Sequence, residues 1–232
     1  MVGILDAMPL PYTCLARPDW IASQDPAHWL TASELAVFAA WPSETRRREW
    51  LTGRLAAKRL IRDAYGLSPL TFSIGRDGDA PCLLGADTPP LCLSLSHSHG
   101  LGAATFSDPQ TEGTAGIDVQ WVRPVHPGLC RRVFTPEEQA QIAEMFGRED
   151  DLEGMLLLWA LKEAAIKARR TAWGQPLRDI EVSLLDDNRS AIQMPGEAPL
   201  TAAYEWLDGW WLARAVREAA QLQEAKTFST MG

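Results

Sequence analysis

Apolar and polar residues recur along the chain with two different periods, and these periods predict its helices and strands. Thr31 and Glu34 have the spacing of a capping box, which marks the start of a helix. Pro136 directly after Thr135 fits the first turn of another helix. Apolar positions that return every three to four residues extend such segments. Helices are therefore predicted over residues 31–40, 44–65, from 135 onward, and 152–170.

Between these segments apolar residues alternate with polar ones, as they do in half-buried strands. In the clearest case Leu93 and Leu95 face one way, while Ser94 and Ser96 face the other. Strands are predicted over residues 70–74, 91–96, 101–106, 115–122, 180–185 and 210–216. Because helices and strands occur in both parts of the chain, we expect an α/β (α+β) fold of two comparable halves, residues 1–113 and 114–232.

The composition narrows the class of protein. With 232 residues, 46% of them hydrophobic and 22% charged, the chain has the make-up of a globular protein with a substantial core. A net charge of −8 argues against a general binder of nucleic acid or of anionic membranes. No apolar run approaches the roughly 18 residues of a membrane span. Residues 1–10 lack the basic flank of a secretory signal, and the four cysteines show no paired spacing, so we expect a cytoplasmic protein.

One segment reverses the overall acidic balance. Residues 46–62 contain one acidic residue, Glu49, and seven basic residues: Arg46, Arg47, Arg48, Arg54, Lys58, Arg59 and Arg62. Two interpretations stay open, a solvated helix face and a binding site for phosphate groups. A nucleic-acid interface is disfavoured, because aromatic residues do not interleave with the arginines.

Charged residues also stand out in two otherwise apolar segments. Asp118 lies between Ile117 and Val119 in a predicted strand, where aspartate is disfavoured. It is therefore a fixed oxygen ligand, one partner of a buried ion pair, or an edge residue facing water. Glu163 and Lys167 are four residues apart and share one face of the apolar helix, where they form either a surface ion pair or part of a cleft. A strand carboxylate and a helix carboxylate that meet across a cleft suit a hard cation such as Mg²⁺, together with phosphate oxygens.

The end of the predicted strand 91–96 offers small hydroxyl groups and His97 to an anion, with ordinary loop residues as the alternative interpretation. A serine hydrolase is not expected, because adjacent Ser and His side chains diverge in a strand and no Gly-x-Ser-x-Gly turn is present. A zinc site is not expected either, since Cys92, His97 and His99 match no usual zinc spacing.

Three segments occur in order along the chain: Ser94-Leu-Ser-His-Ser98, Gly116-Ile-Asp-Val-Gln120 and Trp159-Ala-Leu-Lys-Glu-Ala-Ala-Ile-Lys167. Together they closely resemble the signature set of the Sfp-type 4′-phosphopantetheinyl transferases. The resemblance implies a pseudo-two-fold fold of two similar α/β halves, with coenzyme A in the groove between them, and a monomer. It also implies transfer of the phosphopantetheine arm to a serine of an acyl- or peptidyl-carrier protein, with release of adenosine 3′,5′-bisphosphate.

Carried over by position, the resemblance implies roles for single residues. Asp118 and Glu163 match the metal-binding carboxylates, with Mg²⁺ as the expected ion and Mn²⁺ as the alternative. Lys167 matches a lysine near the pyrophosphate, and Glu163 is the candidate to accept the proton of the incoming serine. The residues expected to contact coenzyme A are Arg46, Arg76, Ser96, His97, Lys162 and Lys167.

Gln120 departs from the family pattern, because many members carry a third metal-binding Glu at this position. A neutral amide binds a metal only through its carbonyl oxygen or through a water molecule, which puts metal affinity in question. Ala80 stands where a lysine often contacts phosphate. A catalytically weakened homologue that binds coenzyme A or a carrier is therefore the alternative function. A docking patch for the carrier protein, or simply core, is expected from Phe134, Met145 and Phe146.

Overall fold

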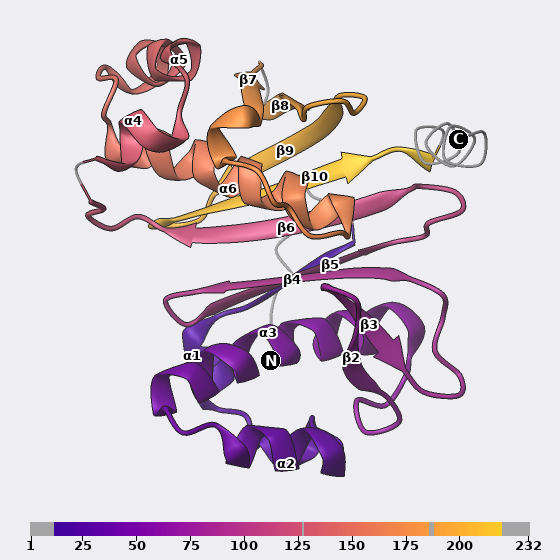
Figure 1. The fold of residues 1–232 in the computed structure, drawn as a ribbon. Helices are drawn as coiled ribbons and strands as arrows, with labels where there is room; N and C mark the ends of the chain where they lie inside the picture. Colours follow the sequence, from indigo (N-terminus) through magenta and orange to yellow (C-terminus); the bar gives the residue numbers. More distant parts are fainter. Residues whose placement is uncertain (1–11, 127, 186–187, 220–232) are drawn as a thin grey trace.

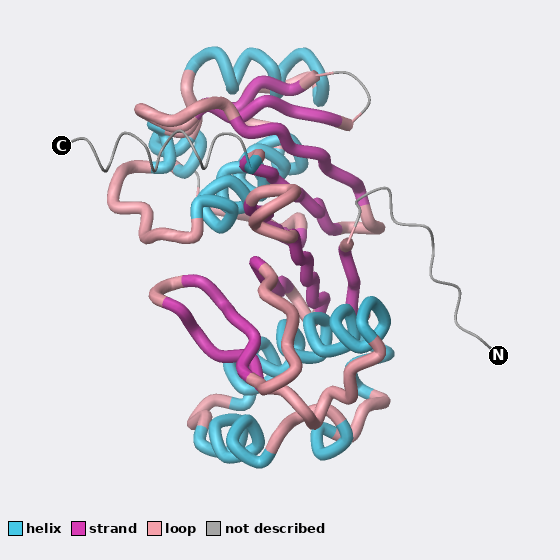
Figure 2. Tube along the Cα trace, turned by 90° about the vertical axis from the view of Figure 1, so that its right-hand side faces the viewer, coloured by secondary structure: helices cyan, strands magenta, loops and turns pink. Residues whose placement is uncertain are grey.

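Two long helices, each laid across an antiparallel sheet, give the chain four layers (Figure 1). The computed structural model describes residues 12–126, 128–185 and 188–219. Helix α3 (Glu44–Tyr65) covers the first sheet and α6 (Leu152–Arg169) covers the second, and the two sheets meet in the middle. Figure 2 shows the same stacking from the side, with the helices on the two outer faces and strands between them.

The first half, residues 12–113, is built around α3. Its sheet has the antiparallel strand order β1-β5-β4, and β2 and β3 form a separate hairpin. Its elements are β1 (Thr13–Ala16), α1 (Pro18–Ala22), the 3-10 turn η1 (Pro26–His28), α2 (Ala32–Ala40), α3, β2 (Ser73–Asp77), β3 (Ala80–Leu84), β4 (Cys92–Ser98) and β5 (Leu101–Ser107).

The second half, residues 114–219, repeats this order of elements around α6. Its sheet runs β6-β10-β9-β8-β7, and the order β6-β10-β9 matches β1-β5-β4 of the first half. Its elements are β6 (Thr114–Trp121), α4 (Leu129–Val133), α5 (Pro136–Phe146), α6, the 3-10 turn η2 (Leu177–Asp179), β7 (Glu181–Leu184), β8 (Arg189–Gln193), β9 (Leu200–Trp206) and β10 (Trp210–Arg217). The expected α+β class with two similar halves is confirmed.

The predicted helix boundaries follow from local hydrogen bonding. Thr31 and Thr135 each form a complete capping box, at the start of α2 and α5. Gly66 closes α3 in the left-handed conformation, at φ 68°. The strand predicted over residues 70–74 lies later in the chain, as β2, and β1, β3, β8 and β9 were not predicted. Of these, β1, β3 and β8 are short and are defined mainly by their pairing partners, whereas β9 has seven residues whose burial alternates.

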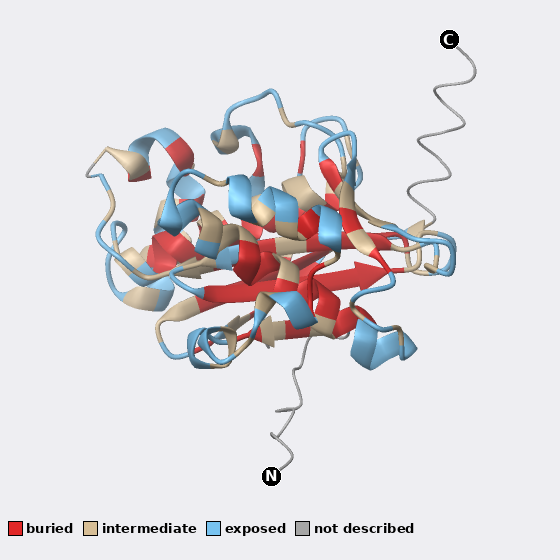
Figure 3. Cartoon of the chain, turned by 90° about the horizontal axis from the view of Figure 1, so that it is seen from below, coloured by how far each residue is buried: buried red, intermediate tan, exposed pale blue. Residues whose placement is uncertain are grey.

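Buried residues fill the spaces between the layers (red in Figure 3). The apolar cluster between the two sheets includes Leu101 from β5, Ile117 and Val119 from β6, and Leu212 from β10. All four cysteines are free thiols. Within the described ranges, no helix combines the length and the apolar character that a membrane crossing requires.

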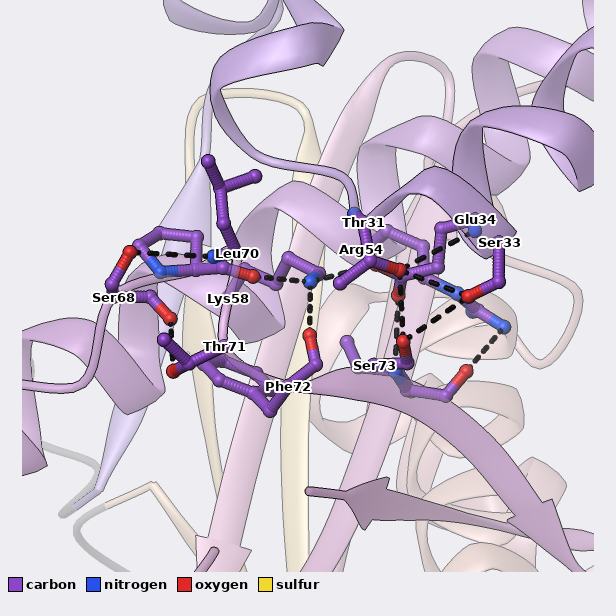
Figure 4. A network of polar contacts seen from close by, with 12 residues as sticks. Thr31, Ser33, Glu34, Arg54, Lys58, Ser68, Leu70, Thr71, Phe72 and Ser73 are labelled. Carbon is purple, nitrogen blue, oxygen red and sulfur yellow. Dashed lines mark hydrogen bonds and ion pairs between the residues drawn. The ribbon is translucent and has the colours of Figure 1, made fainter. Parts of the chain in front are cut away.

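Each half contains a buried lysine–glutamate pair at the corresponding place, and Figure 4 shows the one in the first half. Lys58 Nζ lies 2.7 Å from Glu34 Oε2 and donates to the carbonyl groups of Pro69 and Phe72. The other carboxylate oxygen of Glu34 accepts the N–H of Ile74. The pair therefore joins α2, α3 and the hairpin β2-β3.

In the second half Lys162 of α6 takes the place of Lys58. Its Nζ lies 2.8 Å from Glu138 Oε2 and donates to the carbonyl groups of Val133 and Leu177. Glu138 Oε1 accepts the N–H of Val182 on β7. The same threonine, glutamate and lysine, at equal spacing, thus build the same anchor in both halves.

Candidate active site

The strand residue Asp118 lies on β6 with 3% of its surface exposed, and three side chains donate to its carboxylate. Oδ1 accepts from Ser96 Oγ at 2.7 Å and from Lys167 Nζ at 2.6 Å, while Oδ2 accepts from Gln120 Nε2 at 2.7 Å. These donors come from β4, α6 and β6. Asp118 is therefore a fixed acceptor at the junction of both halves, and not an edge residue facing water.

Gly116 explains how α6 comes close enough to reach Asp118. A Cβ atom at this glycine would clash with the carbonyl oxygen of Ala164 and the amide nitrogen of Ala168. The backbone of the helix therefore rests directly on the strand. Glu163 and Lys167 lie one helical turn apart on the helix, and this contact brings both of them to Asp118.

The carboxylate of Glu163 is electrostatically coupled to Asp118. Burial and then repulsion by Asp118 raise the pKa of Glu163, and the Lys167 ammonium opposes them only in part. Two carboxylates and the Gln120 amide are hard oxygen donors, which suit Mg²⁺. Across residues 12–126, 128–185 and 188–219, no three His, Cys, Asp or Glu side chains form a metal cluster.

A cavity of about 690 Å³ opens beside this group, between the two halves. His97 of β4 and Lys167 of α6 are part of its wall, so it adjoins Asp118. Further basic and aromatic side chains in the lining are Arg54, Arg76, Arg170, Trp41, Trp50 and Trp173. The guanidinium of Arg54 lies over the Trp50 ring, 4.5 Å from its centroid. Cations and flat apolar rings together suit an anionic ligand that carries a planar group.

Arg170 joins the two halves at the cavity wall. It ends α6 in the left-handed conformation, with a φ of 63°. Its guanidinium donates to the carbonyl of Leu93 on β4 at 2.9 Å and to that of Pro81 on β3 at 3.1 Å. The helix that carries Glu163 is thereby connected to the first half.

Apart from Lys162, the residues expected to contact coenzyme A separate into three groups. Arg76, His97 and Lys167 line the cavity. Arg46 is exposed in the first turn of α3 and is not part of the described lining. Ser96 is buried, and its hydroxyl proton goes to Asp118. Partial desolvation, more than any nearby charge, lowers the pKa of His97, so its ring is neutral at pH 7.

The expectation that Lys162 contacts coenzyme A is wrong. The side chain is completely buried, and its ammonium is occupied by Glu138 and two backbone carbonyls. It also lies over the ring of Phe134, which is itself fully buried and therefore part of the core. Met145 remains exposed, and Phe146 is half-buried against Trp211.

Several lining residues were not singled out from the sequence. Arg54 belongs to the basic segment, and in the sequence nothing distinguishes it from its neighbours. In the fold its guanidinium stacks on the ring of Trp50. Arg170 was assigned to the end of a helix, where a basic residue needs no further explanation. Trp41 and Trp173 are far apart in the chain, and only the fold brings them to one cavity.

The family model and the curated relatives that match this chain are all named as 4′-phosphopantetheinyl transferases. Residues 114–219 match the family model of the 4′-phosphopantetheinyl transferase superfamily. The chain is 35% identical over 150 residues to the 4′-phosphopantetheinyl transferase AcpT of Salmonella typhimurium, an alignment that covers 62% of this chain and 71% of AcpT. It is 27% identical over 148 residues to the 4′-phosphopantetheinyl transferase ffp of Bacillus subtilis, and spans 62% of that protein's length.

Among solved structures, a holo-(acyl-carrier-protein) synthase from Bacillus anthracis in complex with CoA overlaps with a TM-score of 0.36. It is 24% identical, and the overlap covers 40% of this chain and 90% of that one.

Proposed function

Because this chain belongs to the 4′-phosphopantetheinyl transferase superfamily, we propose that it moves the phosphopantetheine arm of coenzyme A to a serine of an apo acyl- or peptidyl-carrier protein. The observation that carries the proposal is the cavity of basic and aromatic residues whose wall includes Lys167, the ion-pair partner of Asp118. Coenzyme A has the matching chemistry, since it joins a planar adenine to a 3′-phosphate and a diphosphate.

Different basic side chains of the cavity lining bind different phosphate groups of coenzyme A. Arg54, Arg76 and His97 belong to the first half and suit the 3′-phosphate end. Lys167 lies next to Asp118 and suits the diphosphate, where negative charge develops on the leaving group. A bound phosphate favours the protonated imidazole, so binding of coenzyme A raises the pKa of His97.

The carboxylates of Asp118 and Glu163 are the proposed ligands of Mg²⁺, with Mn²⁺ as the alternative, and Gln120 contacts the ion through its carbonyl oxygen or through water. The electrostatics of Glu163 support this assignment. Burial first, and repulsion by Asp118 second, raise its pKa, the Lys167 ammonium offsets them only in part, and a cation between the two carboxylates would stabilise their charged forms. When bound, the ion neutralises the diphosphate and the charge that develops during transfer.

The serine oxygen of the carrier attacks the β-phosphorus of coenzyme A. A new P–O bond forms, the bond from that phosphorus to the bridging oxygen breaks, and adenosine 3′,5′-bisphosphate leaves with the electron pair. Glu163 is the proposed acceptor of the serine proton, directly or through a water molecule. Lys167 stabilises the leaving bisphosphate.

Both walls of the cavity come from one chain, which supports a monomer as the working unit. The free thiols of all four cysteines support a reducing, cytoplasmic location. Exposed Met145 supports an apolar contact with the carrier protein.

The proposal is tested by incubating the protein with coenzyme A, Mg²⁺ and a panel of apo-carrier proteins, and then measuring the intact mass of each carrier. We expect one or more carriers to gain a phosphopantetheine group, and we expect Asp118→Asn and Glu163→Ala to abolish the gain. A protein that binds coenzyme A but modifies no carrier would instead support the catalytically weakened homologue.

A further inference from the structure

The two sheets meet along a row of serine hydroxyl groups. Strand β4 forms one edge of the first sheet and β6 one edge of the second. The hydroxyl oxygens of Ser94, Ser96 and Ser98 accept the N–H groups of Ile117, Val119 and Trp121 at 3.1, 3.2 and 3.0 Å. The partners advance together along both strands, so β4 and β6 run parallel, and serine oxygens replace the carbonyl acceptors of an ordinary sheet.

Ser96 differs from the serines on either side of it. Its oxygen accepts the N–H of Val119, and its proton goes to Asp118 Oδ1 at 2.7 Å. Both side chains are buried, with 7% and 3% of their surfaces exposed. In the part of the chain that the structure describes, the hydroxyls of Ser94 and Ser98 donate to no carboxylate. One strand of the first half therefore orients an acidic side chain of the second half.

The other two donors to Asp118 cannot have this role when a cation and a diphosphate arrive. Lys167 is long and 28% exposed, and its positive charge is repelled by an incoming cation. Gln120 is half-buried, and its amide must turn to present oxygen to a metal. Ser96 is short, neutral and held by the backbone of Val119, so it alone keeps its contact with Asp118 unchanged.

We infer that Ser96 is a positioning residue that fixes the Asp118 carboxylate for metal binding. The inference rests on the metal site in the proposed function. Groups that hydrogen-bond to metal ligands orient them, and their loss typically lowers metal affinity about 10–100-fold.

The test is a titration of the full chain with Mn²⁺, followed by electron paramagnetic resonance, with and without coenzyme A. Ser94→Ala is the matched control, because it removes the equivalent hydroxyl from the same seam but no donor to a carboxylate. We expect Ser96→Ala to bind Mn²⁺ roughly 10–100-fold more weakly, Ser94→Ala to bind as wild type, and Ser96→Thr to restore most of the affinity. Thermal unfolding tests whether each variant is folded. If Ser96→Ala is not folded, Ser96→Cys is used in its place.

Three results overturn the inference. Wild-type affinity for Mn²⁺ in Ser96→Ala, with weakened binding of coenzyme A, would make Ser96 a contact to the coenzyme. Equal losses in Ser94→Ala and Ser96→Ala would leave only a structural role for the seam. A wild-type protein that binds no Mn²⁺ in either titration would remove the metal site itself, and with it this part of the proposed function.

Discussion

Gln120 has a defined orientation beside Asp118. Its Nε2, and not its carbonyl oxygen, faces Asp118 Oδ2 at 2.7 Å, because two oxygens at that distance would repel. The amide therefore covers one carboxylate oxygen. A glutamate at this position would lose that hydrogen bond and add a negative charge to the proposed metal site.

We expect Gln120→Glu to lower the Mg²⁺ concentration at which transfer is half-maximal, by about 10-fold or more. The measurement is a Mg²⁺ titration of the transfer rate. Gln110→Glu, on an exposed turn, introduces the same charge away from the site and serves as the control. An identical titration in Gln120→Glu and wild type would show that the side chain does not contact the metal.

Glu163 is expected to lower stability at neutral pH. Since its folded pKa is raised, the folded protein binds more protons than the unfolded one between the ordinary value of 4.5 and the raised value, and stability falls as pH rises through that window. Glu163→Gln should therefore have a higher urea midpoint than wild type at pH 7, and the difference should disappear near pH 4.

Glu144→Gln, an exposed replacement on α5, is the control for this pH experiment. Equal urea midpoints of Glu163→Gln and wild type at pH 7 would mean that the Glu163 carboxylate does not lower the free energy of unfolding. The same variant should be unable to transfer, because an amide accepts no proton from the serine.

Among single residues, the sequence predicted those whose unusual position is local. Asp118 in an apolar strand, and Glu163 and Lys167 in an apolar helix, are visible as exceptions without knowledge of the fold. The buried ion pair of Lys162 could not be predicted from the sequence, because its partner Glu138 lies on another helix. A lysine that is buried in the core and a lysine that lines a cleft have the same local sequence pattern.

The contact between α6 and β6 is the element-level feature on which the site depends. We expect Gly116→Ala to lower the free energy of unfolding by about 1–3 kcal/mol, as overpacking does, and to reduce transfer more than stability alone explains, because α6 must move away from Asp118. Urea unfolding and transfer rates measure the two effects.

Gly174→Ala is the matched control for Gly116→Ala, since no atom lies near the position where its Cβ would be. Normal stability and activity in Gly116→Ala would contradict the backbone contact between helix and strand.

Helix α6 is also held by its buried lysine. Removing one partner of a buried ion pair typically costs about 3–5 kcal/mol, so Lys162→Met should be strongly destabilised in urea, and Glu138→Leu combined with Lys162→Met should recover much of the loss. The folded double variant should still bind coenzyme A with wild-type affinity in calorimetry. If the folded double variant binds coenzyme A weakly, Lys162 does contribute to coenzyme A binding.

The boundaries of the predicted helices are more accurate than those of the predicted strands, although the short helices α1 and α4 were not predicted. A capping threonine or a closing glycine directly flanks the helix that it delimits, whereas β1 exists because Thr13–Ala16 pair with Gly102–Thr105, far along the chain. Strands β8 and β9 depend in the same way on each other and on β10.

At the scale of the whole molecule, the cavity exists only where the two halves are held together. Arg170 supplies two hydrogen bonds across this boundary. We expect Arg170→Met to lose roughly 2 kcal/mol or more of stability, because charged hydrogen bonds typically contribute about 1.5–3 kcal/mol, and to bind coenzyme A more weakly in calorimetry. Arg123→Met, at an exposed position, is the control.

Unchanged binding and stability in Arg170→Met would show that the remaining contacts between the halves suffice. Two comparable halves were expected from the distribution of predicted elements, and their similarity from the resemblance to the family. The repeated lysine–glutamate anchor was not predicted, although Thr31, Glu34 and Lys58 have the same spacing as their counterparts in the second half.

The seam of serines also bears on synthesis of the chain. Strand β4 leaves the ribosome before β6 and has an open edge until β6 arrives. Open edges pair readily with strands of other molecules. We therefore expect the first half to be prone to such pairing until β6 docks onto the serine hydroxyl groups of β4 and covers this edge.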